Sequence, residues 1–218
     1  MFVQIEEVKI FFEKSGKGQP ILLLHGNGED HTIFRELVQK LSRQYSVYAI
    51  DSRNHGQSSS GHPISYDAMM QDMYGLIREL RLEKPILLGF SDGGITGLLL
   101  AQKYPELLDR LIVCGANMYP SGMKKWAIVL MALAYLTGRK PEIKMMLTEP
   151  HMKAEELAGI RTATHVLAGS RDLIRTAHTK ALAECIQGST LAILQGETHS
   201  SYVLNNEKLY RAVASCLT

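Results

Sequence analysis

The stretch LLGFSDGGITG, residues 87–97, places a serine between two glycines and an acid directly after the serine. The apolar residues before Ser91 are typical of a buried strand, and those after it have helical spacing. A serine in such a turn projects its hydroxyl above the sheet, and flanking glycines bring no Cβ into the crowded backbone. The helix N-terminus adds a field that favours developing negative charge. The stretch predicts a nucleophilic serine. The alternative is that its glycines only allow the strand and the helix to pack closely.

Short apolar segments alternate with segments of helical period on both sides of this turn. The alternation predicts an α/β protein with βαβ units and a mostly parallel central sheet that helices cover on both faces. A hairpin near 2–14 would add antiparallel edge strands. The predicted strands are 21–26, 47–51, 86–89, 111–115, 164–169 and 191–194, and the predicted helices are 30–42, 66–81, 93–103, 174–187 and 206–216.

The alternation is interrupted after the strand that ends at Gly115. The next strand begins only about fifty residues later, which is too long for a plain loop in a compact domain. The middle of this interval is apolar and has helical spacing. We therefore expect a small helical cap over 117–158, inserted into a core formed by 1–116 and 159–218. Trp126 in the cap is a candidate substrate-binding residue. The alternative interpretation of the whole segment is an extra core helix with no role at a site.

A serine hydroxyl needs a base to remove its proton, and the base needs an acid to fix its tautomer. Of the eight histidines, His199 follows the last predicted strand, so its loop opens at the same sheet edge as Ser91. The loop after the preceding strand offers Asp172. The other loop that could supply the acid, GANMYP at 115–120, contains none. These positions predict a catalytic triad of Ser91, Asp172 and His199.

An oxyanion intermediate needs two backbone donors. One is the amide of Asp92, and the other is expected from HGNG at 25–28, most simply the amide of Asn27. Asn27 can instead be only a turn former, and its amide can donate in either case. The side chain of Asp92, taken by itself, is explained as an acid at a helix N-terminus that complements the helix dipole.

Five motifs together resemble the α/β-hydrolase superfamily of serine hydrolases. They are HGNG, DSRNHGQS at 51–58, GFSDGG, GSRD and GETH, and they occur in the family's order, including serine before acid before histidine. Asn54 departs from the usual R-G-H-G, in a loop whose role is structural. Residues 87–120 resemble more narrowly the valacyclovir-hydrolase-like branch, enzymes that cleave amino-acid esters. This resemblance implies that Asp92 holds the amino group of the substrate.

Composition argues against several other classes of protein. The 218-residue chain has a net charge of +2 and no long charge run, so nothing indicates a nucleic-acid or membrane-surface partner. Its longest apolar run, at 126–136, is about half of the ~20 residues that a membrane-spanning helix needs. The first twelve residues alternate in polarity and lack the pattern of a signal peptide. The three cysteines fit neither a disulfide framework nor a zinc site, which indicates a cytoplasmic protein.

We therefore expect a carboxylic-ester hydrolase that acts on a small-molecule ester through an acyl-enzyme on Ser91. No metal or other cofactor is expected, and the chain is predicted to be a monomer or homodimer. Two alternatives stay open at this point. The same triad can serve amide, thioester or carbon–carbon bond hydrolysis or perhydrolysis, or the fold can bind a small ligand with little turnover.

Overall fold

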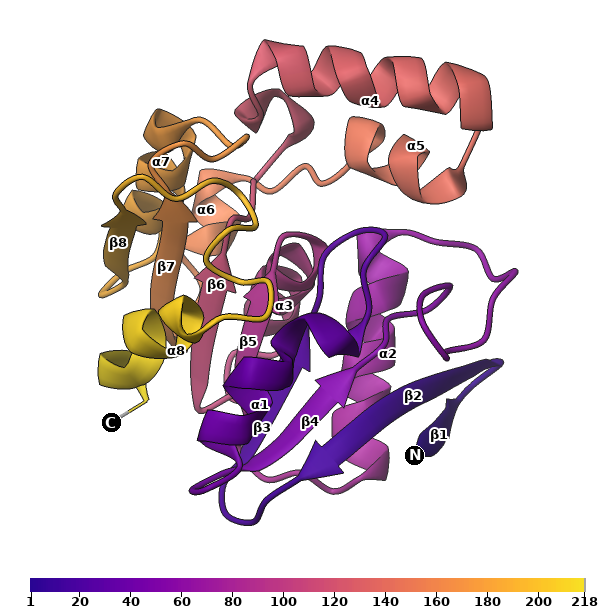
Figure 1. Cartoon of the computed structure of the whole chain (residues 1–218), viewed down its shortest axis with the longest axis vertical. Coiled ribbons are helices and arrows are strands. Elements are labelled where there is room, and N and C mark those ends of the chain that lie inside the picture. Colours follow the sequence, from indigo (N-terminus) through magenta and orange to yellow (C-terminus); the bar gives the residue numbers. More distant parts are fainter. Residues whose placement is uncertain (218) are drawn as a thin grey trace.

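The computed structural model describes residues 1–217 and contains one eight-stranded sheet with helices on both faces (Figure 1). The strand order is β1-β2-β4-β3-β5-β6-β7-β8. Both pairings of β2 are antiparallel, and all other neighbours are parallel. The strands are β1 (Phe2–Ile5), β2 (Val8–Ser15), β3 (Pro20–Leu24), β4 (Ser46–Ile50), β5 (Ile86–Phe90), β6 (Arg110–Cys114), β7 (Ala163–Gly169) and β8 (Thr190–Leu194).

Two apolar clusters, one on each face of the sheet, form the core. Successive side chains of a strand point to opposite faces, so Leu22 and Leu24 of β3 join one cluster while Ile21 and Leu23 join the other. The first cluster includes side chains of α2 (Tyr66–Glu79), α3 (Asp92–Lys103), α6 (Ala154–Leu157) and α7 (Thr176–Cys185), and the second includes those of α1 (Arg35–Leu41) and α8 (Glu207–Val213). Burial on both faces explains why the central parallel strands β3 to β6 are continuous apolar runs, whereas the edge strand β8 is largely exposed.

The predicted fold class is confirmed, and the differences lie at element ends. The segment predicted as one helix over 30–42 is a 3₁₀ turn, η1 (His31–Phe34), followed by α1. The last helix likewise ends in a 3₁₀ turn, η3 (Ala214–Cys216). Asp30 caps η1 through a hydrogen bond from the amide of Thr32. Helix ends commonly tighten in this way, so period alone does not locate them.

The long interval between β6 and β7 contains η2 (Pro120–Gly122), α4 (Lys125–Gly138), α5 (Pro141–Thr148) and α6. In Figure 1, α4 and α5 lie at the top of the molecule, beyond the carboxyl ends of the parallel strands. Leu157 of α6 is instead fully buried in the core. The division into a cap over 117–158 and a core stays a prediction. Within residues 1–217, no helix combines the length and apolar character needed to cross a membrane.

Candidate active site

Ser91 occupies a strained turn between β5 and α3. Its φ of 51° and ψ of −114° lie in a region that residues other than glycine rarely adopt. The two flanking glycines make this turn sterically feasible. A Cβ on Gly89 would lie 2.2 Å from the carbonyl oxygen of Gly93, and one on Gly93 would lie 2.3 Å from that of Leu24. The motif around Ser91 therefore reflects close backbone packing as well as exposure of the serine hydroxyl.

The three residues predicted as a triad lie together at the carboxyl ends of β5, β7 and β8. His199 Nε2 is 3.1 Å from Ser91 Oγ, and His199 Nδ1 is 2.7 Å from Asp172 Oδ1. Asp172 is buried, and its Oδ1 also accepts the amide of Ile174 at 2.9 Å. Because a carboxylate can only accept, Nδ1 carries the proton and Nε2 is free to accept from the Ser91 hydroxyl. This arrangement can activate Ser91 as a nucleophile.

Gly115, directly after β6, allows His199 to sit between Ser91 and Asp172. Its φ is +63°, and a Cβ built there would lie 2.9 Å from His199 Cε1 and 3.0 Å from His199 Nδ1. The His199 ring also packs against Phe90, with 4.9 Å between the ring centroids. The sequence analysis missed this role of Gly115. A glycine at the carboxyl end of a strand was the available signal, but the contact with His199 depends on the assembled sheet.

Asn27 and Asp92, whose backbone amides are the predicted oxyanion donors, line the same pocket as Ser91. Neither amide donates a hydrogen bond to an acceptor within residues 1–217. The loop that carries Asn27 closely approaches the nucleophile, since a Cβ on Gly26 would lie 3.0 Å from Ser91 Cβ. Two free amides beside a serine hydroxyl can stabilise a developing oxyanion.

The side chain of Asp92 is buried and held by two neutral donors. Tyr66 Oη donates to its Oδ1 at 2.8 Å, and Asn27 Nδ2 donates to its Oδ2 at 3.2 Å. Burial raises the pKa of the Asp92 carboxyl, while the two hydrogen bonds act in the opposite direction. Burial also raises the pKa of Tyr66 well above its ordinary value, so the phenol stays a neutral donor. Tyr66, which the sequence analysis missed, brings α2 into the site.

Glu29 is a second acid in this pocket, and it too was missed. Its Oε2 accepts the amide of Gly26 at 3.0 Å, which fixes the loop beside Ser91. Partial burial raises the pKa of the Glu29 carboxyl. The motif HGNGED contains this acid, but it could be placed beside Ser91 only once the path of the loop was known.

The pocket above Ser91 has a volume of about 250 Å³ and one apolar side. That side is lined by Met123, Met131, Met146, Leu173 and Ile174. The lining also includes two carboxylic acids, Asp92 and Glu29, and among residues 1–217 no lysine or arginine lines the pocket. Trp126, predicted as a substrate-binding residue, is 57% exposed on α4 and does not line this pocket. The α4 residue that does line it is Met131.

A separate cluster of Asp30, His31 and Asp51 has spacing that could suit a metal ion. Its groups are already engaged with one another and with the backbone. Asp51 Oδ1 accepts both the amide and Nδ1 of His31 at 2.7 Å, and Asp51 Oδ2 accepts the amide of Gln57 at 2.8 Å. Asp30 caps η1. These contacts explain the cluster as a structural element that ties the turn after β4 to η1.

Comparison with known proteins places this chain in a family. The family model described as alpha/beta hydrolase fold matches residues 19–139. The sn-1-specific diacylglycerol lipase ABHD11 of Mus musculus is 34% identical over 161 residues, which cover 72% of this chain and 50% of that protein. The serine hydrolase BPHL of Homo sapiens is 33% identical over 124 residues, which cover 54% of this chain and 43% of that protein.

Solved structures agree with this placement. The esterase EaEST from Exiguobacterium antarcticum superimposes with a TM-score of 0.86 at 21% identity, covering 99% of this chain and 98% of that one, which is a likeness of fold. This chain aligns with only part of each ABHD11 relative, namely 33% of the Danio rerio protein and 50% of the Mus musculus protein. The family match nevertheless covers more than half of the 218 residues. The chain therefore belongs to the alpha/beta hydrolase fold family.

Proposed function

We propose that this protein is a serine hydrolase that cleaves a small carboxylic ester through an acyl-enzyme on Ser91. The observation that carries the proposal is the chain of contacts from Ser91 Oγ to His199 at 3.1 Å and from His199 to Asp172 at 2.7 Å. The names of the relatives, which include a lipase and a serine hydrolase, support the same class of reaction.

The reaction would proceed in two steps. His199 Nε2 takes the proton of Ser91 as Oγ attacks the ester carbonyl, and it returns that proton to the departing alcohol. Water then attacks the acyl-enzyme carbonyl as His199 takes its proton, and His199 returns that proton to Ser91 Oγ as the acyl–Oγ bond breaks and the carboxylic acid leaves. In both steps the amides of Asn27 and Asp92 donate to the oxyanion, and Asp172 stabilises the imidazolium.

The pocket limits the acyl group. Its volume of about 250 Å³ lies below the roughly 300–1,000 Å³ that is typical of sites for drug-sized ligands. The methionines and the Leu173–Ile174 wall offer an apolar surface to a short chain. Small esters therefore fit this site better than long-chain ones.

The charge of the pocket gives the proposal a more specific form. Asp92 and Glu29 lie on its wall without a lysine or arginine, so an anionic acyl group is disfavoured. Asp92 is buried with neutral donors only, and a buried carboxylate gains from a cationic partner. A substrate ammonium group would supply that partner. We therefore propose an α-amino ester as the preferred substrate.

The central proposal is tested by pre-steady-state hydrolysis of p-nitrophenyl acetate. An acyl-enzyme mechanism in which deacylation is the slower step releases a burst of about one p-nitrophenol per chain. Ser91→Ala should keep the circular dichroism spectrum of the wild type and lose activity by about 10⁴-fold or more. Ordinary turnover by a folded Ser91→Ala variant would contradict the proposal.

The substrate preference is tested with the p-nitrophenyl esters of alanine and of propionic acid, which differ only by the amino group. Asp92→Asn keeps the backbone amide and should lower kcat/KM selectively for the alanine ester. Glu29→Gln is the matched control, because it neutralises the other pocket acid. Equal losses on both esters in Asp92→Asn would assign the side chain of Asp92 to the helix terminus alone.

A further inference from the structure

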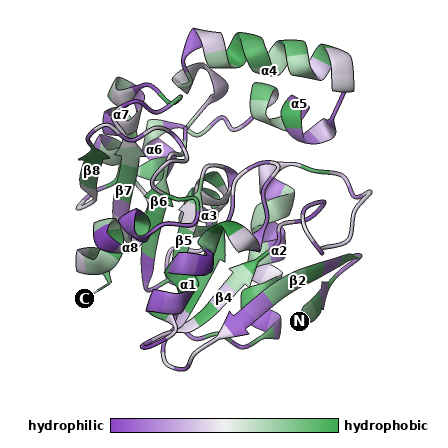
Figure 2. Ribbon diagram, viewed as in Figure 1, coloured by the Kyte–Doolittle hydropathy of each residue, from purple (hydrophilic) through white to green (hydrophobic). Residues whose placement is uncertain are grey.

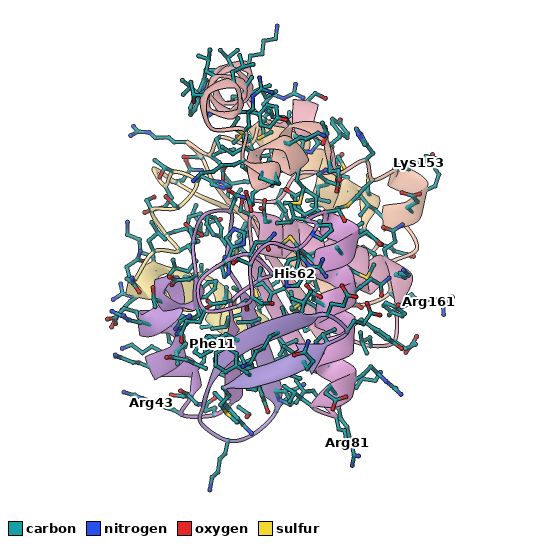
Figure 3. All side chains as sticks on the ribbon, turned by 90° about the vertical axis from the view of Figure 1, so that its right-hand side faces the viewer. Phe11, Arg43, His62, Arg81, Lys153 and Arg161 are labelled. Carbon is teal, nitrogen blue, oxygen red and sulfur yellow. The ribbon has the colours of Figure 1, made fainter. Side chains whose placement is uncertain are left out.

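The outer face of α4 is an apolar stripe that nothing in the described chain covers. It consists of Trp126, Val129, Leu130, Leu133 and Leu136, each more than half exposed. Their spacing of three and four residues places them on one side of the helix. Figure 2 shows α4 as a largely hydrophobic helix at the top of the molecule, and Figure 3, viewed along its axis, shows side chains projecting outward. An exposed apolar patch of this kind marks an interaction surface.

Both ends of this stripe are basic. Lys124 and Lys125 stand at the start of α4, and Arg139 and Lys140 follow its end. No acidic residue lies between 123 and 141. When such a helix lies flat on a surface, its apolar side chains enter that surface while the long basic side chains reach outward at both ends. The pattern is complementary to an apolar layer beneath a negatively charged boundary.

A second copy of the chain does not match this pattern. Two stripes packed against each other, parallel or antiparallel, would place basic ends against basic ends. The helix itself carries no acid that could offset this repulsion. Insertion across a membrane is also excluded by length, because 14 residues form a helix of about 21 Å against a hydrocarbon core of about 30 Å.

We propose that α4 docks this protein on the surface of an anionic phospholipid bilayer. The stripe lies at the boundary between headgroups and acyl chains, and the four basic residues contact the phosphates. No membrane-surface partner was expected from the sequence, because the whole chain has a net charge of only +2 and no long charge run. The charge around α4 differs from this overall balance, because basic residues lie at both ends of an apolar helix. The inner side of the same helix carries Met131 to the pocket, so docking would bring the pocket cover next to the lipid.

Trp126 makes the proposal directly measurable because it is the only tryptophan in the chain. Vesicles of phosphatidylcholine with about one quarter phosphatidylserine should shift its emission to the blue and should sediment the protein. Pure phosphatidylcholine vesicles should do so much less, and added salt should weaken the anionic binding. Phosphatidylcholine brominated on its acyl chains should quench Trp126, which contact between two protein copies would not cause.

Two pairs of variants separate the two parts of the surface. Leu130→Gln with Leu133→Gln should lower vesicle partitioning at least about tenfold, whereas Leu191→Gln with Leu204→Gln changes exposed leucines elsewhere and should not. Lys124→Gln with Lys125→Gln should lower partitioning about 10- to 30-fold on anionic vesicles.

The control for charge is Arg43→Gln with Arg81→Gln, at the opposite end of the molecule from α4 (Figure 3). This double variant loses the same number of positive charges as the lysine variant, and it should bind anionic vesicles as the wild type does. Vesicle sedimentation and bromine quenching do not depend on hydrolysis, so failure of the proposed reaction would leave this test intact. Absence of binding to anionic vesicles would overturn the proposal. So would a dimer, seen by analytical ultracentrifugation, that Leu130→Gln with Leu133→Gln dissociates.

Discussion

Replacing Gly115 with alanine is expected to impair catalysis by displacing His199, in addition to destabilising the fold. The new Cβ would lie 2.9 Å from His199 Cε1, whereas ordinary van der Waals contact begins at 3.4 Å. The imidazole must therefore retreat by about 0.5 Å or more, away from its position between Ser91 and Asp172. A displacement of about 1 Å at a reacting group can cost on the order of 10²-fold in rate. For a retreat between about 0.5 and 1 Å we expect kcat/KM to fall about 10- to 100-fold, or about 1.4–2.7 kcal/mol of transition-state stabilisation.

The backbone contributes a separate and smaller cost. At a φ of +63°, an alanine loses about 1–2 kcal/mol relative to glycine because its Cβ crowds the following carbonyl oxygen. Gly188→Ala is the matched control. Gly188 has a φ of +74°, and a Cβ there would meet no atom within 4 Å. This control should lose similar stability and keep its activity.

The assay is kcat/KM with p-nitrophenyl acetate, paired with urea unfolding of the wild type and both variants. Wild-type activity in a folded Gly115→Ala variant would refute the reasoning, because the His199 contact would then have no catalytic consequence. A loss of activity in Gly188→Ala as large as that in Gly115→Ala would refute it too, because backbone strain alone would explain the effect.

Three further outcomes are expected. Asp172→Asn should lower kcat by about 10³- to 10⁴-fold in ester hydrolysis, because a neutral amide no longer fixes the tautomer of His199; a loss below tenfold would contradict the triad. Asn27→Ala keeps its backbone amide, so kcat should stay within about tenfold of the wild type; a larger loss would mean that the side chain itself serves the oxyanion. Burial lowers the pKa of His178 to about 4, whereas the same side chain in the unfolded protein has a pKa of about 6.5. The unfolded state therefore binds a proton at this residue before the folded state does, and the free energy of unfolding decreases as pH falls from about 6.5 to 4. Urea unfolding of His178→Gln should show a weaker loss over that range, and an unchanged pH dependence would contradict this assignment.

The sheet and the grouping of the triad residues could be predicted because both depend on local rules. Short apolar runs mark the strands, and Ser91, Asp172 and His199 each follow such a run, although β8 before His199 is a largely exposed edge strand. The carboxyl ends of parallel strands meet at one edge, so three residues far apart in sequence were expected to come together there. No knowledge of packing distances was needed for that step.

Residues whose roles depend on distance could not be predicted in the same way. Gly115 matters because a Cβ at this position would lie 2.9 Å from His199 Cε1. Glu29 matters because its carboxylate reaches back to accept the amide of Gly26. Tyr66 begins a helix that the sequence did place, but its hydrogen bond to Asp92 depends on where α2 meets α3. Each of these contacts joins elements whose relative position is set by the whole core.

The rotation of α4 about its axis is the most consequential feature that apolar period left undetermined. Its residues from Trp126 to Leu136 are apolar almost all the way round, so composition gives no inner face. In the structure, Met131 turns toward the pocket while Trp126 and its neighbours turn away. A helix that is apolar on both sides can cover a substrate with one face and meet an apolar partner with the other. This two-sidedness, together with the basic residues at both ends, makes α4 a candidate link between the small pocket and a lipid surface.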